Sequence, residues 1–217
     1  YCDCGVDKFG FPSGWSYNDI WVDIVVILDT SEALGVDALE EAETLIESFI
    51  SDGIADFLVT NSNALFYSRL GVISMSDRAD VIYNLNMTKA DSMQGKVSIK
   101  KGVAQINVVD AFEAALLMFN SGSKPERATA RQVVYYITDS DAKNDLQYLD
   151  EFKASKGVVI VNREVARPAL KELASEGYYY LNSDYMQGLQ AFCEANCFCK
   201  PNKDTYDGAD PTIKASG

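Results

Sequence analysis

The 217-residue chain contains no histidine. This absence excludes Ser-His-Asp and Cys-His catalytic triads and histidine-based zinc catalysis, and it removes the commonest general base near neutral pH. The sequence also lacks a Walker loop, and no G-x-G-x-x-G follows its first apolar run, where Val22 to Gly35 reads VDIVVILDTSEALG. We therefore expect a protein without catalytic activity.

Positive charge is scarce as well, because 32 Asp and Glu side chains outnumber 19 Lys and Arg side chains and give a net charge of −13. Nucleic acids and anionic membrane surfaces both attract clusters of Lys and Arg. No apolar run approaches the roughly 20 residues that span a bilayer. We expect no nucleic-acid partner and no membrane insertion.

Cysteine is absent from the long interior of the chain, and the five cysteines lie near its ends: Cys2, Cys4, Cys193, Cys197 and Cys199. If the fold brings the ends together, disulfide bonds between them close a very long loop, which the chain-entropy model values at roughly 4–5 kcal/mol per bond. A zinc cluster of cysteines is the alternative. The odd cysteine stays free or pairs with another chain, so the protein could form a covalent dimer. The glycosylation triplet Asn86-Met87-Thr88 agrees with a secreted, extracellular protein.

Strand-like and helix-like segments alternate along the first half of the chain. The apolar, β-branched run from Val22 to Leu28 is typical of a strand that is covered on both faces of a parallel sheet. From Leu39 to Ile50, apolar side chains recur at three- and four-residue steps, as on one face of an amphipathic helix. The runs Phe66 to Met75 and Ala79 to Leu85 are separated by Ser76-Asp77-Arg78, and this spacing predicts a hairpin.

The alternation continues in the second half. Further helices are predicted at Asp110 to Phe119, Leu146 to Ser155, after Pro168 and at Asp184 to Glu194. Further strands are predicted at Gln132 to Ile137, Val158 to Val161 and Tyr178 to Leu181. This order predicts an α/β fold with a doubly wound, mostly parallel central sheet, one antiparallel edge strand and helices on both faces.

Acidic and hydroxyl side chains follow two of the predicted central strands. The first loop reads Asp29-Thr30-Ser31-Glu32 and the second reads Thr138-Asp139-Ser140-Asp141. A third loop, 102–109, precedes a helix and should lie beside them, because ligands of open α/β sheets gather beyond the carboxyl ends of the strands. Oxygen ligands of this kind suit Mg²⁺ or Ca²⁺. Alternatively, Asp29 and Asp139 simply cap the helices that follow.

Two stretches, WVDIVVILDTSEA at Trp21 to Ala33 and VVYYITDSD at Val133 to Asp141, resemble the von Willebrand factor A domain. The resemblance covers Asp23 to Cys199 and implies a Rossmann-like domain with a metal-ion-dependent adhesion site, of pattern DxSxS plus a Thr and a late Asp. The leading CxC, the phrase W-x-D-I-V-x-x-x-D-x-S and the closing LQAFCEANCFCK are similar to nematode secreted proteins that join this domain to a C-type lectin domain. Composition indicates an extended lead-in over 1–20 and, where periodicity is lacking, a linker or disordered tail over 200–217. The von Willebrand factor A-like domain is then expected over 21–199.

The adhesion motif is incomplete when it is carried over residue by residue. Asp29 and Ser31 match the first two positions of DxSxS, and Asp139 matches the late Asp, but Ala33 occupies the third position. The stretch VAQINVV, where the resemblance implies a Thr, has no hydroxyl side chain. Mg²⁺ requires near-octahedral oxygen donors, so the site is expected to be weak or empty and no cofactor is required.

The expected function is non-catalytic extracellular recognition or adhesion, through a degenerate site that binds a protein, matrix or glycoprotein ligand. One alternative is adhesion that depends on Mg²⁺ or Ca²⁺, because the charge of Glu32 or Asp141 could compensate for lost hydroxyls. A second alternative is a structural unit that orients a neighbouring C-type lectin domain. Tyr178-Tyr179-Tyr180 is a further surface candidate, although alternate rings of a strand should point into the core. The ligand-face candidates are Thr30, Glu32, Gln105, Asn107, Ser140 and Asp141.

Overall fold

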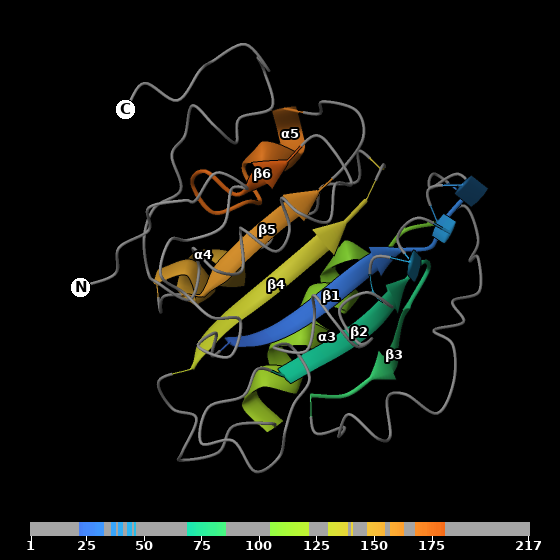
Figure 1. Ribbon diagram of the computed structural model, residues 1–217. Helices are drawn as coiled ribbons and strands as arrows, with labels where there is room; N and C mark the ends of the chain where they lie inside the picture. Colours follow the sequence, from blue (N-terminus) through green and yellow to red (C-terminus); the bar gives the residue numbers. More distant parts are fainter. Residues whose placement is uncertain are drawn as a thin grey trace, which may run out of the picture.

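The computed structural model describes residues 22–32, 69–85, 105–121, 130–138, 140, 147–154, 157–162 and 168–180, and the positions 36, 37, 39, 40, 43, 44 and 46. The described helices and strands are drawn in colour in Figure 1. Several features of the sequence lie outside the described residues: the five cysteines, Ala33, Asn86, Asp139, Asp141, the lead-in 1–20, the tail 200–217 and the predicted helix Asp184 to Glu194.

Within the described part of the chain, six strands form one sheet at the centre of the protein (Figure 1). They are β1 (Val22–Asp29), β2 (Arg69–Met75), β3 (Ala79–Tyr83), β4 (Arg131–Ile137), β5 (Val158–Asn162) and β6 (Tyr179–Tyr180). Their order in the sheet is β3-β2-β1-β4-β5-β6, and every neighbouring pair is parallel except the β2–β3 hairpin. The predicted mostly parallel sheet with one antiparallel edge strand is confirmed.

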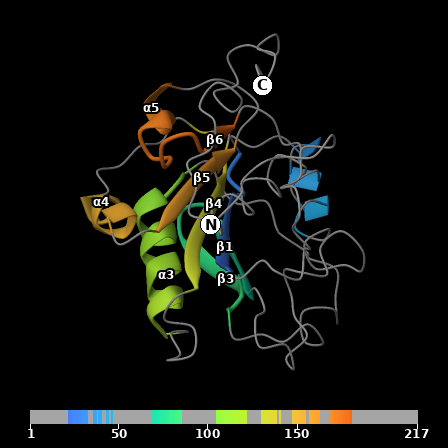
Figure 2. The ribbon, with the colours of Figure 1, turned by 60° about the vertical axis from the view of Figure 1, so that its left-hand side comes forward.

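Helices cover both faces of this sheet. The described ones are α3 (Val108–Ser121), α4 (Gln147–Ala154) and α5 (Pro168–Lys171). Figure 2 shows α3 and α4 on one face and the helical positions between 36 and 46 on the other. Leu39 and Ile46 of that first helix are buried and Glu40 is exposed, as its amphipathic pattern predicts. None of the described helices is long and apolar enough to cross a membrane.

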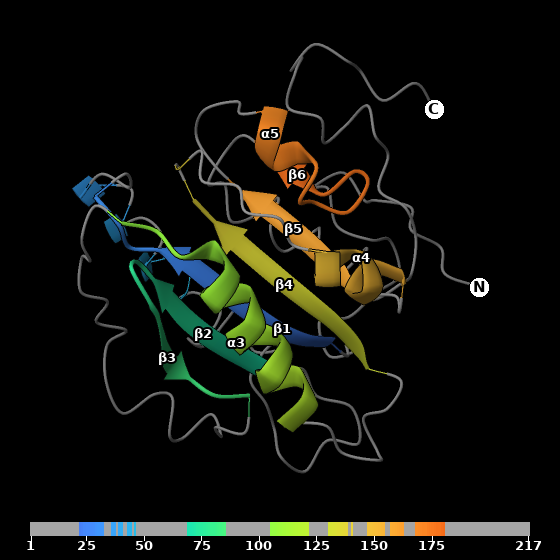
Figure 3. The same cartoon turned by 180° about the vertical axis from the view of Figure 1, so that it is seen from behind.

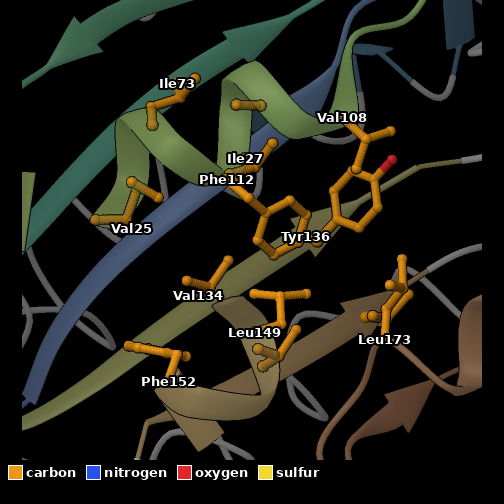
Figure 4. Close-up of a cluster of buried hydrophobic side chains, with 14 of the residues drawn as sticks. Val25, Ile27, Ile73, Val108, Phe112, Val134, Tyr136, Leu149, Phe152 and Leu173 are labelled. Atoms are coloured by element: carbon orange, nitrogen blue, oxygen red, sulfur yellow. The ribbon is translucent and has the colours of Figure 1, made fainter. Parts of the chain in front are cut away.

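The main core lies between the sheet and α3, which packs over β1 and β2 (Figures 3 and 4). β1 is buried along its whole length, which accounts for its apolar, β-branched sequence. Phe119 of α3 stacks on Phe152 of α4 with ring centroids 5.8 Å apart, so the two helices share one core. Residues of this cluster include Val25, Ile27, Ile73, Val108, Phe112, Val134, Tyr136 and Leu149.

Two local expectations differ from the structure. α3 begins at Val108, ahead of the predicted start at Asp110, because the side chain of Asn107 caps the helix. The three tyrosines at 178–180 are all buried, at 4%, 5% and 2% exposure, so the interpretation of this run as a ligand-contacting surface is wrong. The expected alternation holds for the main core, which includes Tyr179 and neither of its neighbours. Tyr179 packs in the main core, and both neighbouring rings are covered as well, so the run offers no exposed aromatic surface.

Candidate functional site

Asp29, the last residue of β1, lies at the centre of the carboxyl-end face and is 0% exposed. The Ser31 amide donates a hydrogen bond to Asp29 Oδ1 at 2.9 Å, and the Thr138 hydroxyl donates one to Asp29 Oδ2 at 2.7 Å. These are its hydrogen-bond partners within the described part of the chain. The carboxylate therefore connects the end of β1 to the residue that follows β4.

The hydrogen bond from Thr138 to Asp29 was not predicted from the sequence, in which the carboxylates after Thr138 are the more obvious ligands. Thr138 is fully buried, and its Oγ1 accepts a hydrogen bond from the Ser140 amide at 2.9 Å while donating to Asp29. The signal that could have found it is positional. The parallel register pairs Leu28 with Ile137, so the next residues, Asp29 and Thr138, come side by side.

Thr30 points toward β2 rather than toward solvent. Its amide donates to the carbonyl oxygen of Met75 at 2.8 Å, and its Oγ1 donates to the same oxygen at 3.2 Å. The hydroxyls of Thr30 and Ser74 also share a hydrogen bond of 2.9 Å. Because Thr30 is 1% exposed, it holds the β1–β2 junction and does not present a side chain to a ligand.

The loop before α3 is fastened to the turn of the β2–β3 hairpin. The backbone N–H of Asn107 donates a hydrogen bond to the Ser76 carbonyl oxygen at 2.7 Å, and its side-chain Oδ1 accepts one from the backbone N–H of Asp110 at 3.1 Å. Asp110 Oδ2 in turn accepts from the Ala79 amide at 2.7 Å. The amide oxygen of Asn107 is therefore used to cap α3, whereas Gln105, two residues earlier, is exposed.

The predicted site residues are brought together only in part. Asp29, Ser31 and Ser140 are buried at the ends of β1 and β4, and Glu32 is exposed beside them. Asp139 and Asp141 lie outside the described residues. No group of three or more His, Cys, Asp or Glu side chains in the described residues could hold a metal ion.

The described donors do not make a complete cation site. Asp29 is the one carboxylate at the buried centre of the described face, and both of its oxygens already accept hydrogen bonds. Mg²⁺ takes oxygen donors in near-octahedral geometry and usually keeps several waters, so the described carboxylate and hydroxyls supply only part of such a set. What the arrangement does offer is a layer of buried, hydrogen-bonded side chains at the strand ends. We call this layer the floor of the face, and it consists of Thr30, Ser74, Asp29 and Thr138.

Comparison with known proteins agrees with this fold. The structure is similar to that of proximal thread matrix protein 1 from the mussel byssus. One crystal form of that protein has 18% sequence identity and a TM-score of 0.65, and the match covers 82% of this chain and 49% of that chain. A structure of the same protein with zinc in its metal-ion-dependent adhesion site (MIDAS) motif is 19% identical with a TM-score of 0.65. The match covers 82% of this chain and 48% of that chain. The chain thus spans about half the length of these structures. No curated protein matches the chain. The sequence profile of the von Willebrand factor type A domain matches residues 23–194, and the chain belongs to that family.

Proposed function

We propose that the chain is a non-catalytic extracellular recognition module that binds a protein or glycoprotein ligand through the carboxyl-end face and requires no cation. The observation that carries the proposal is Asp29, whose two oxygens accept hydrogen bonds from the chain's own Ser31 amide and Thr138 hydroxyl. A buried carboxylate that is hydrogen-bonded in this way has part of its desolvation cost offset without a metal. Membership of the von Willebrand factor type A family supports a binding role, and likeness to a byssus matrix protein supports an extracellular setting.

The geometry also argues against catalysis at this face. A nucleophilic or basic carboxylate must reach its substrate, and Asp29 is 0% exposed. The chain has no histidine that could act as a general base beside it. Recognition needs only exposed side chains that complement the ligand, arranged around the floor. The structure of this face therefore fits recognition better than catalysis.

Ligand contact is assigned to the exposed side chains around this floor, Glu32 and Gln105, together with Asp141 on the strength of the sequence. The remaining candidates support the loops instead, since their described hydrogen bonds go to neighbouring strands, loops and a helix: Thr30, Asn107 and Ser140.

The test is surface plasmon resonance of the immobilised chain against a panel of extracellular matrix proteins and glycoproteins, in EDTA and in Mg²⁺ or Mn²⁺. We expect at least one binder, with an affinity that changes by less than about twofold between the two buffers. Glu32→Lys and Gln105→Lys are expected to weaken binding roughly tenfold, since each places a wrong charge on the contact face. Glu151→Lys, on an exposed position of α4, is the matched control and should leave binding unchanged.

A cation-dependent adhesion module is the second candidate, favoured by the zinc-occupied MIDAS motif of the mussel protein. In this case Asp29, Ser31 and Asp139 would contribute ligands to a divalent ion such as Mg²⁺ or Ca²⁺. The same experiment separates the two, because binding lost in EDTA and restored by the cation supports this candidate and contradicts the first.

The sequence resemblance to nematode proteins with a C-type lectin domain supports a further role as a unit that orients such a neighbour. Under this proposal residues 1–20 lead into a domain at 21–199, and 200–217 form the linker. The terminal cysteines form disulfides, Asn86 carries a glycan, and the odd cysteine links two chains. Non-reducing electrophoresis is then expected to show a covalent dimer that reducing agent converts to a monomer. A monomer under both conditions would contradict the assembly role.

A further inference from the structure

Three neighbouring strand ends are joined by hydroxyl groups on the carboxyl-end face. Thr30 joins β1 to β2 through Ser74 and the Met75 carbonyl, and Thr138 joins β4 to β1 through Asp29. We propose that Thr138 is the positioning residue of this face, and that its hydroxyl holds Asp29 in the role that a bound cation would otherwise fill. The proposal rests on the cation-independent recognition proposed above, and it names Thr138 as the residue that makes a cation unnecessary.

The first step is the charge of Asp29. A carboxylate that is 0% exposed is costly to bury unless hydrogen bonds or opposite charge offset the lost hydration. Within the described residues no Lys or Arg forms an ion pair with it, since the described ion pairs are Arg69–Asp23 and Arg78–Asp80. Among the described residues the offset therefore comes from the two hydrogen bonds, and hydrogen bonds to a charged acceptor are stronger than neutral ones.

The second step is the commitment of the Thr138 hydroxyl. A hydroxyl group has one proton to donate and two lone pairs. The proton goes to Asp29 Oδ2 at 2.7 Å, and one lone pair accepts the Ser140 amide at 2.9 Å. The backbone after β4 thus orients the hydroxyl, and the hydroxyl orients the carboxylate.

The third step is the consequence for the face. The donors come from consecutive strands of the sheet, β2, β1 and β4, and all the side chains involved are buried. Each link is short-range and independent of solution ions. The loops that carry Glu32 and Gln105 consequently rest on a floor with one arrangement, set by the fold and unchanged when divalent cations are removed.

The experiment measures thermal unfolding of the whole chain, without any ligand, in EDTA and with about 5 mM Mg²⁺, Ca²⁺, Mn²⁺ or Zn²⁺. Thr138→Val keeps the shape and removes the hydroxyl, and it is expected to lower Tm in EDTA by roughly 4–8 °C. Thr138→Ser keeps the hydroxyl and is expected to lose less than half as much. In an Asp29→Asn background the loss caused by Thr138→Val should shrink, because the amide does not need a charge-assisted donor.

The proposal further expects the Tm of the wild-type chain to change by less than about 1 °C on adding any of the four cations. A cation-induced rise in wild-type Tm that disappears in Thr138→Val would overturn it, since Thr138 would then serve a metal site. Equal losses for Thr138→Val and Thr138→Ser, or no loss for either, would also overturn it. Because no ligand is present, these results stand apart from the ligand-binding experiment, which tests the proposed function alone.

Discussion

Replacing Arg69 with methionine is expected to lower the free energy of unfolding by about 3–5 kcal/mol, because it removes one partner of a buried ion pair. Arg69 Nε donates to Asp23 Oδ1 at 2.8 Å and Nη2 donates to Oδ2 at 2.6 Å, and both side chains are 5% exposed. The two residues lie opposite each other in the β1–β2 register. Methionine fills much of the same space but leaves the buried Asp23 carboxylate without a guanidinium beside it. Urea unfolding followed by circular dichroism measures the loss.

Two further variants show whether burial is the cause. The exposed pair Arg78–Asp80 has an N–O distance of 3.1 Å with side chains 73% and 51% exposed, so Arg78→Met should cost less than about 1 kcal/mol. The double variant Asp23→Leu, Arg69→Met should recover much of the loss, because no buried charge is left behind. If Arg69→Met and Arg78→Met cost the same, the buried pair is no more important than a surface pair.

This ion pair also marks a limit of the sequence. Asp23 falls inside a run that predicts a fully covered strand, and nothing near it in the chain explains a buried charge. Its partner lies 46 residues away, and the sheet register alone brings the two together. The strand itself was predictable, because a strand buried on both faces selects apolar, β-branched residues along most of its length.

The site divides in the same way. The sequence predicted Asp29 and Ser31 at the end of β1, since polar residues directly after an apolar strand mark the carboxyl-end edge. It placed Thr138 in the second loop but did not predict its hydrogen bond to Asp29, because a threonine after a strand is ordinary until the register places it beside a buried carboxylate. Nor did it predict that Asn107 is taken up by the cap of α3, where backbone amides compete with any ligand for its side-chain oxygen.

Replacing Phe112 with alanine is the second change with a large expected effect, a loss of about 3–5 kcal/mol in the free energy of unfolding. Phe112 is 0% exposed and lies in the core between α3 and the sheet (Figure 4). Its ring meets that of Tyr136 edge to face, with centroids 5.4 Å apart and an interplanar angle of 79°. Alanine removes this contact and leaves a cavity that the surrounding side chains fill only in part. Urea unfolding measures the loss.

Leu117 of the same helix is 66% exposed, so Leu117→Ala is the matched control and should cost less than about 0.5 kcal/mol. Phe112 also connects the core to the site. Its ring contacts Tyr136, which lies two residues before Thr138, and it belongs to the helix that Asn107 caps. Hydrogen exchange of the amides of Asn107 and Asp110 should therefore quicken in Phe112→Ala and not in Leu117→Ala. Unchanged exchange in both variants would mean that the cap and the loop before α3 are held by their own hydrogen bonds, independently of the core beneath them.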